Sequence, residues 1–303
     1  MSSWQARAFS SAIATLIRRQ SWGDERALAA RARLLFGAPR PYGWLTTLGL
    51  SRKASTDNRV RGEWLTPPGA RPGIVFYVHG GGFVSCSAAT HRPIAAALAR
   101  FTGRRVFSVD YRLAPEERLP AALDDVAEAY DRVAKSESGP IALVGDSAGG
   151  NLVLSLAVRL RDAGHQLPAS VVAFSPWADL AGQSPSVEAN DGRDSMFRTR
   201  NIRDFAAAAL GDLPADSPTL SPVYADLRGL PPVLLHVGST ELLLDDSRRI
   251  DADIRDRGGQ STLRVYEDVP HCWQMLVPFV PEATTSLRDA AAFIDAALVK
   301  SQS

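Results

Sequence analysis

A glycine-rich turn between a short strand and a helix places one serine where it could act as a nucleophile. The apolar run Ile141–Val144 leads into Gly145-Asp146-Ser147-Ala148-Gly149-Gly150, and a second apolar run begins at Leu152. In this strand, turn and helix context, the G-x-S-x-G spacing predicts a strained Ser147 with an exposed hydroxyl, because only small residues at 145 and 149 let strand and helix approach so closely. The N–H of Ala148 would then point to where an oxyanion forms. The alternative is a glycine-rich loop between strand and helix that has no catalytic role.

A second glycine run follows the predicted strand Ile74–Val78. It reads His79-Gly80-Gly81-Gly82-Phe83. Successive glycines expose backbone N–H groups without hindrance from a Cβ, which binding of a tetrahedral oxyanion requires. We predict Gly81 and Gly82 as oxyanion donors beside Ala148; a flexible hairpin tip is the alternative.

A serine hydroxyl is a weak nucleophile near neutral pH and needs a base. His271 is our candidate, because it follows the last predicted strand in a loop ahead of the final helix, and the order oxyanion loop, serine, acid, histidine is that of an α/β-hydrolase. The other four histidines are in different settings. His79 begins the second glycine run, His91 and His165 lie on or near predicted helices, and His236 lies inside a predicted strand.

The base needs an acid to orient it, and three carboxylates follow the predicted strand Val233–Val237. Gly238-Ser239-Thr240 leads directly from the strand end into Glu241, so Glu241 is favoured. Asp245 is the alternative acid; it and Asp246 lie about a turn further, inside the next predicted helix, where Asp245 could also act as a helix-start charge.

Short apolar strands alternate with amphipathic helices from residue 59 onward. This predicts an α/β fold with a mostly parallel central sheet flanked by helices, and a ligand site at the carboxyl ends of the strands. The remaining strands are expected at Val60–Leu65, Arg105–Val109, Ser170–Phe174 and Thr262–Tyr266. The helices are expected at His91–Phe101, Pro120–Ala134, Ala148–Ala163, Leu243–Arg257 and Pro281–Val299.

Two segments fall outside the alternation. Residues 1–45 contain two helical stretches, Trp4–Arg19, which Ser2 or Ser3 could cap, and Asp24–Leu35, and then a link around Pro39–Trp44. Residues 178–230 hold several prolines and glycines around one helical segment near Ile202–Leu210 and look like an insertion over the sheet edge. We predict an N-terminal helical cap at 1–45, a catalytic domain at 46–303, and a contribution to the cap from 178–230.

Composition excludes several classes of protein. The 303 residues are 45% hydrophobic and 22% charged, which is typical of a folded enzyme, and the formal charge of +1 gives no global attraction to nucleic acid or anionic lipid. No apolar run is long enough to span a membrane. Two cysteines, Cys86 and Cys272, make neither a disulfide framework nor a zinc site, so we expect unpaired thiols, no metal and a cytoplasmic location.

With these motifs the chain resembles the bacterial hormone-sensitive-lipase-like branch of the α/β-hydrolases, from about residue 62 to the C-terminus. The matching stretches are His79–Gly82, Tyr111–Glu116, Pro120–Asp125, Gly145–Asn151, Ser175–Trp177 and Glu241–Asp245. The resemblance places the catalytic acid at Glu241, where members usually have aspartate. It also implies an N-terminal helical cap and cofactor-free hydrolysis of short- to medium-chain acyl esters.

We therefore expect a serine carboxylesterase with a small-molecule ester substrate. Phe83 and Trp177, which each follow a site motif, could line the pocket or belong to the core, and Trp4, Phe9 and Tyr42 could touch substrate from the cap. A lactone hydrolase would use the same residues. A binding protein on this fold, as in the plant gibberellin receptors, would have lost the base. The substrate and the oligomeric state, a homodimer included, stay open.

Overall fold

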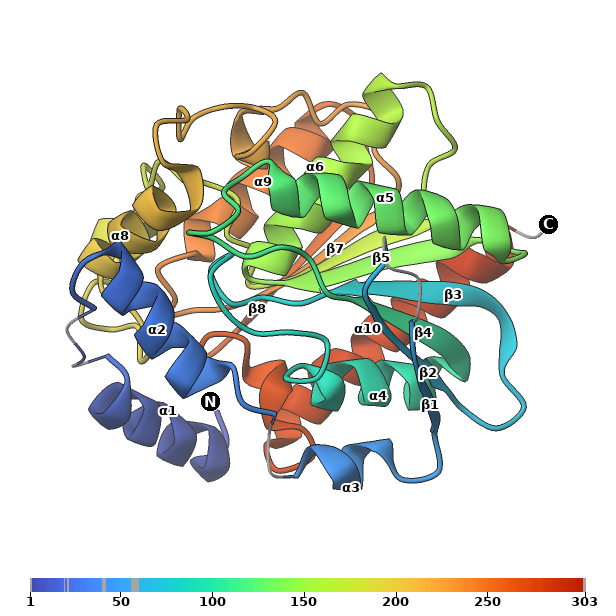
Figure 1. The fold of residues 1–303 in the computed structure, drawn as a ribbon, viewed down its shortest axis with the longest axis horizontal. Coiled ribbons are helices and arrows are strands. Elements are labelled where there is room, and N and C mark those ends of the chain that lie inside the picture. The colour runs from blue at the N-terminus through green and yellow to red at the C-terminus, as the bar shows by residue number, and fades with distance from the viewer. Residues whose placement is uncertain (1, 19, 21, 40–41, 56–59, 302–303) are drawn as a thin grey trace.

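The computed structural model describes residues 2–18, 20, 22–39, 42–55 and 60–301. It confirms the predicted α/β-hydrolase fold (Figure 1). Eight strands form one sheet in the order β1-β2-β4-β3-β5-β6-β7-β8, antiparallel at the β1–β2 and β2–β4 pairs and parallel elsewhere. The strands are β1 Ser51–Ala54, β2 Gly62–Thr66, β3 Arg71–Val78, β4 Arg104–Val109, β5 Ile141–Asp146, β6 Ser170–Phe174, β7 Val233–Gly238 and β8 Ser261–Tyr266.

Helices cover both faces of this sheet. They are α1 Trp4–Leu16, α2 Glu25–Phe36, α3 Gly43–Thr47, α4 Arg92–Thr102, α5 Ala121–Ser136, α6 Ala148–Asp162, α7 Ser186–Ala189, α8 Thr199–Leu210, α9 Leu244–Asp256 and α10 Pro281–Lys300, with 3-10 turns η1 Pro222–Tyr224 and η2 Trp273–Leu276. Side chains alternate across β3, so Ile74 and Phe76 belong to an apolar cluster with residues of α5, α6 and α9, whereas Val75 and Tyr77 belong to a cluster with residues of α4 and α10. Two apolar layers therefore hold the sheet rigid.

The N-terminal helices lie at one end of the sheet, beside α8 (Figure 1). Ser3 caps α1, as expected, through a 3.2 Å bond from the Ala6 N–H to its hydroxyl, and the Ser3 side chain also bonds Glu282 of α10 at 2.8 Å. Trp22, between α1 and α2, packs its ring edge-on against Phe205 of α8 at 5.2 Å. The helix α1 is shorter than the predicted Trp4–Arg19, whose last residue lies outside the described part of the chain.

Three elements were not expected from the sequence: β1, α3 and α7. The helix α3 begins within the predicted link at Pro39–Trp44, of which residues 40 and 41 lie outside the described residues. In the described residues, no helix is long and apolar enough to cross a membrane.

Candidate active site

Ser147 lies between β5 and α6, at the carboxyl end of the sheet. Its φ of 52° and ψ of −118° lie in a region that non-glycine residues rarely adopt, and its N–H is held by the Phe174 carbonyl of β6 at 2.8 Å. At position 149 a Cβ would overlap the carbonyls of Val78 and His79. The predicted strained turn is therefore present, and glycine at 149 is what allows helix and strand to meet.

The structure brings three of the predicted residues into one hydrogen-bonded chain. His271 Nε2 is 2.9 Å from Ser147 Oγ, and His271 Nδ1 is 2.6 Å from Glu241 Oε2. The other oxygen of Glu241 accepts bonds from the Ser175 hydroxyl at 2.7 Å and the Gly238 N–H at 2.6 Å. Because both carboxylate oxygens have fixed partners, Glu241 can hold the imidazole in one orientation.

Burial and the charges of nearby carboxylates shift the pKa of His271 in opposite directions. Burial disfavours the imidazolium, but the Glu241 carboxylate favours it through its charge and hydrogen bond, and the pKa of His271 is raised above its ordinary value of 6.5. Asp194 lies nearby, and its carboxylate accepts the N–H groups of Leu242, Met196 and Phe197. Burial and the charge of Glu241 raise the pKa of Asp194. No motif in the sequence indicated this residue.

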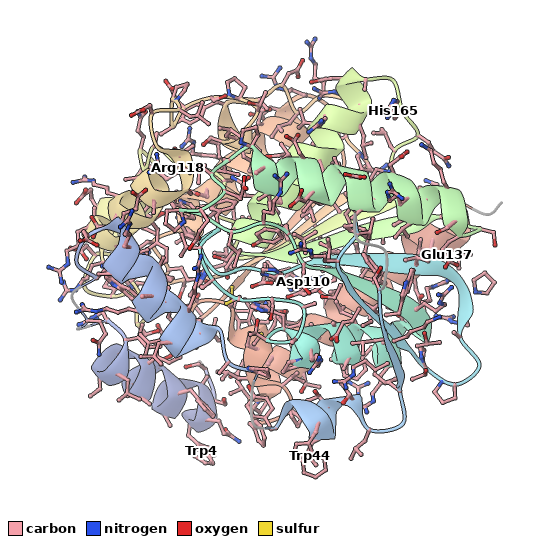
Figure 2. The ribbon with its side chains drawn as sticks, in the orientation of Figure 1. Trp4, Trp44, Asp110, Arg118, Glu137 and His165 are labelled. Atoms are coloured by element: carbon pink, nitrogen blue, oxygen red, sulfur yellow. The ribbon has the colours of Figure 1, made fainter. Side chains whose placement is uncertain are left out.

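The alternative acid and three of the other histidines do not contact Ser147, His271 or Glu241. Asp245 forms an ion pair with Arg248 at 3.0 Å, and its N–H bonds the Ser186 hydroxyl. Asp246 is buried against Ala178 and Asp179. His236 bonds Ser286 and Asp289, His79 stacks on Tyr111 at 4.2 Å, and His165 lies at the far edge of the molecule (Figure 2).

The predicted oxyanion loop lies directly beside Ser147. Gly81 and Gly82 have φ values of 116° and 62°, and a Cβ would overlap the Ser85 carbonyl in one case and the Phe205 ring in the other. Among the described residues, neither N–H donates a hydrogen bond to the protein. Both glycines line the cavity at Ser147, and Ala148 begins α6 on the other side of the serine. The N–H groups of Gly81 and Gly82 are thus available to a ligand, and Ala148 lies next to the serine.

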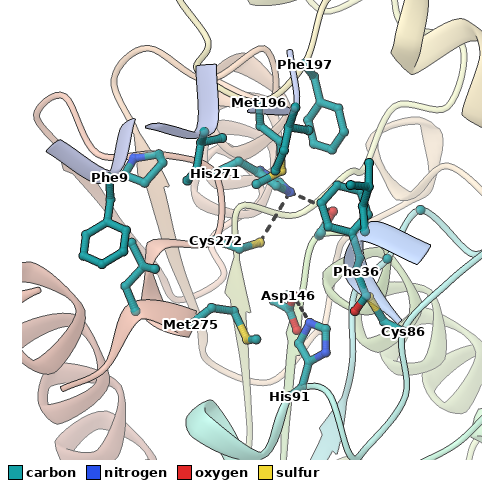
Figure 3. Close-up of a pocket in the computed structure, with 18 of the residues that line it drawn as sticks. Phe9, Phe36, Cys86, His91, Asp146, Met196, Phe197, His271, Cys272 and Met275 are labelled. Carbon is teal, nitrogen blue, oxygen red and sulfur yellow. Dashed lines mark hydrogen bonds and ion pairs between the residues drawn. The ribbon is translucent and has the colours of Figure 1, made fainter. Parts of the chain in front are cut away.

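A cavity of about 360 Å³ opens above Ser147 (Figure 3). Its apolar wall comes from α1, α2, α8, η2 and the loop before α8: Phe9, Ile13, Ile17, Leu35, Phe36, Met196, Phe197, Phe205, Met275 and Leu276. Of the three residues suggested for the cap side, Phe9 and Tyr42 line this cavity, whereas Trp4 does not. Phe83 and Trp177 are not part of the wall either. They are buried in the apolar core, where their rings lie 5.7 Å apart.

The floor of the cavity also holds an ionisable cluster that the sequence did not indicate. His91 Nε2 is 3.2 Å from Asp146 Oδ2, and the other Asp146 oxygen accepts bonds from the Tyr77 hydroxyl and the Gly80 N–H (Figure 3). Burial acts to raise the pKa of Asp146, but His91 and these hydrogen bonds outweigh it, and the pKa is lowered. Asp146 therefore links the nucleophile turn to the oxyanion loop.

The two cysteines face the same cavity without forming a disulfide. Cys272 Sγ is 3.4 Å from His271 Nε2, and burial raises the pKa of its thiol well above the ordinary value. The thiol is therefore protonated and a poor nucleophile. No group of three or more potential metal ligands occurs within the described part of the chain.

The chain is similar to known hydrolases in sequence and in fold. A family model of the alpha/beta hydrolase fold matches residues 75–275. An acetyl-hydrolase of Streptomyces hygroscopicus is 35% identical over 234 residues, which cover 77% of this chain and 78% of that protein. The crystal structure of an esterase from the bacterial hormone-sensitive lipase family superposes with a TM-score of 0.85 at 34% identity, over 98% of this chain and 99% of that one. The structure of the protein EstE5, soaked with p-nitrophenyl butyrate, superposes with a TM-score of 0.88 at 30% identity and the same coverage.

The fold and the site define an α/β-hydrolase. Within that class, the chain belongs to the bacterial hormone-sensitive-lipase-like family. The predicted enzyme class, a carboxylic ester hydrolase, is confirmed by these relatives.

Proposed function

We propose that the protein is a serine carboxylesterase in which Ser147 attacks the ester carbonyl and forms an acyl-enzyme. The observation that carries this proposal is the continuous chain from Ser147 Oγ through the His271 ring to the Glu241 carboxylate, at 2.9 and 2.6 Å. As the serine attacks, its proton passes to His271 Nε2, and Glu241 stabilises the imidazolium that forms. His271 then donates the proton to the leaving alkoxide, which departs as the alcohol.

In the second half of the reaction His271 takes a proton from water, and the resulting hydroxide attacks the acyl carbonyl. The acid is released when the Ser147 oxygen leaves and regains its proton from His271. In both halves the carbonyl oxygen becomes negative, and the N–H groups of Gly81, Gly82 and Ala148 would stabilise it, because no protein acceptor competes for the two glycine donors among the described residues.

The cavity supports short- to medium-chain acyl esters as substrates. Its volume of about 360 Å³ suits a small ester, and its wall is mostly apolar. The named acetyl-hydrolase activity of one relative and the soaking of another with p-nitrophenyl butyrate point the same way. The names of the relatives do not favour lactone hydrolysis. A protein that only binds a ligand would not need the hydrogen-bonded residues Ser147, His271 and Glu241.

We also propose that residues 1–45, together with residues 178–230, act as a cap over this site. Both segments contribute to the cavity wall, through Phe9, Ile13 and Ile17 in the first and Met196, Phe197 and Phe205 in the second. A cytoplasmic location is part of the proposal, since neither cysteine forms a disulfide.

The first prediction tests the nucleophile with the variant Ser147→Ala. We expect its kcat for p-nitrophenyl butyrate to fall by about 10⁴-fold or more, because the attacking oxygen is lost while little volume changes. A fluorophosphonate should label Ser147 in the wild type and should not label the variant. The matched control is Ser155→Ala on the same helix α6, whose hydroxyl bonds Asn151 away from the cavity. Near wild-type turnover by Ser147→Ala, with circular dichroism unchanged, would disprove the proposal.

A further inference from the structure

The N-terminal helices expose an unusual number of large apolar side chains. Of the twelve such residues exposed in the described part of the chain, eight lie before residue 49. Trp4, Trp44 and Leu34 are 69%, 63% and 80% exposed. Isolated exposed apolar residues are common, but a concentration of them in one segment marks an interaction surface.

The part of the chain that contains these side chains, residues 1–53, has a net positive charge. Residues 1–53 contain nine Arg and Lys against Asp24 and Glu25, a formal charge of +7, so the rest of the chain, with a total of +1, is at −6. The near-zero net charge therefore conceals a strong asymmetry. Attraction to an anionic surface depends on the local electric field. The net charge of +1 therefore does not exclude an attraction between residues 1–53 and an anionic surface.

Several of these cations are available to a partner. Arg26 and Arg31, on α2, are exposed and have no hydrogen bond or ion pair with any residue that the structure describes. Arg7, on α1, is also exposed and bonds only the Ser2 carbonyl within that part of the chain. The acids nearby are engaged: Glu25 pairs with Arg118, and Asp24 caps α2.

The exposed aromatic residues lie on one edge of the molecule. Trp4 on α1 and Trp44 on α3 both project outward from the lower edge in Figure 2. The surface is continuous with the cavity wall, because Phe9 and Leu35 are both exposed and line the cavity. A partner that covers this edge would therefore lie next to the entrance of the site.

We propose that this N-terminal surface, formed by Trp4, Leu16, Leu34, Trp44, Leu45 and Leu48 with the cations Arg7, Arg26 and Arg31, docks on the surface of an anionic lipid bilayer. Tryptophan favours the interface between headgroups and acyl chains, and arginines near the surface are attracted to anionic headgroups. A lipid surface satisfies both features at once, whereas a second copy of the chain docked through the same surface would bring +7 against +7. The docking is peripheral, and the cavity entrance would lie close to esters dissolved in the membrane.

Cosedimentation with vesicles tests the proposal without using activity. We expect the full chain to bind mixed phosphatidylcholine–phosphatidylglycerol vesicles at low salt and pure phosphatidylcholine vesicles much more weakly. Binding should fall when salt shortens the screening length from about 30 Å to about 3 Å. The double variants Trp4→Ala/Trp44→Ala and Arg26→Gln/Arg31→Gln should each lower the partition coefficient by about tenfold or more.

Two control variants separate this surface from general effects of charge and apolarity. Arg132→Gln/Lys135→Gln removes two positive charges from α5, outside the N-terminal surface, and Leu213→Ala/Val299→Ala removes two exposed apolar residues elsewhere. Both should bind as the wild type does, and so should Ser147→Ala, so the result does not depend on catalysis. Equal binding to both kinds of vesicle would overturn the proposal, and so would an equal loss of binding in the control variants. It would also be overturned if the protein bound no vesicles and formed a dimer in size-exclusion chromatography that Trp4→Ala/Trp44→Ala dissociates.

Discussion

At the scale of single residues, the acid that bonds His271 is a glutamate, and the local backbone accommodates a side chain one methylene longer than aspartate. Glu241 follows the end of β7, and its carboxylate folds back to accept the Gly238 N–H at 2.6 Å. A Cβ at position 238 would come within 3.0 Å of Glu241 Oε1 and 2.8 Å of the Val269 carbonyl. Glycine at the strand end therefore makes room for the longer acid, which still reaches His271.

The second prediction separates the two acids. Glu241→Gln keeps the shape but presents an amide to Nδ1, and we expect kcat to fall by about 10³–10⁴-fold, as in other triads where the acid becomes an amide. Asp245→Asn is the matched control and should stay near the wild type, because Asp245 pairs with Arg248 and does not contact His271. Measurement of kcat/KM for both variants shows which carboxylate orients His271. If Asp245→Asn is inactive and Glu241→Gln is active, Asp245 is the catalytic acid and Glu241 is not.

The third prediction concerns the pH at which His271 gains its proton. The base acts in its neutral form, and Glu241 raises the pKa of His271 above 6.5, so kcat/KM should decline as the pH falls through a value above 6.5. In Glu241→Gln the charge that favours the imidazolium is gone, so the same ionisation should move to lower pH. An NMR titration of the His271 ring nitrogens in both proteins measures it, and an unchanged midpoint in the variant would contradict this origin of the shift.

The residues of the hydrogen-bonded chain could be predicted because each follows a strand in a recognisable order. Ser147 has a local motif, and Glu241 and His271 follow β7 and β8. Phe83 and Trp177 also follow site motifs, yet both point into the core, since the direction of a side chain after a turn depends on local backbone angles such as the positive φ of Phe83. Nothing in the local sequence separates these two cases.

At the scale of elements, strands with an apolar face were predicted and polar ones were not. The strand β1, Ser51–Ala54, is exposed along its whole length and reads Ser-Arg-Lys-Ala, without any apolar alternation. It forms only because the edge of β2 offers backbone partners. The cavity wall was beyond prediction for a similar reason, because α1 and α8, nearly 200 residues apart, meet only through tertiary packing.

The fourth prediction tests the part that α1 plays in the wall. Ile13→Ala removes part of an apolar side chain from the cavity wall and so enlarges the cavity, and it leaves Ser147 and its hydrogen-bond partners unchanged. Since each buried methylene contributes about 0.8 kcal/mol, the ratio of kcat/KM for octanoate over butyrate esters should rise several-fold as longer chains gain room. Thr15→Ala, on the exposed face of α1, is the control and should leave the ratio unchanged. A ratio that stays constant in Ile13→Ala would show that the acyl chain lies elsewhere.

At the scale of the whole molecule, ionisable groups buried away from the site affect the stability of the fold. Asp246, in the first turn of α9, lies under the segment that follows β6, and its Oδ2 accepts the N–H groups of Ala178 and Asp179 at 2.8 and 2.9 Å. Its Oδ1 has no hydrogen-bond partner among the described residues. Burial raises the pKa of Asp246 from 3.8 to about 7, and the nearby charge of Asp179 adds to this shift, whereas the hydrogen bonds that the carboxylate accepts oppose it.

The last prediction follows from the sign of that shift. Between pH 4 and pH 7 the folded protein holds a proton on Asp246 that the unfolded chain has lost, so this group makes the free energy of unfolding decrease as the pH rises through that range. Asp246→Asn keeps an oxygen acceptor for the two N–H groups and cannot ionise. We expect the variant and the wild type to have similar unfolding midpoints near pH 4, and the variant to be more stable at pH 8 by a few kcal/mol at most. Urea unfolding of both proteins across this range measures the difference, and parallel stability curves would mean that Asp246 is already ionised in the folded protein at pH 4.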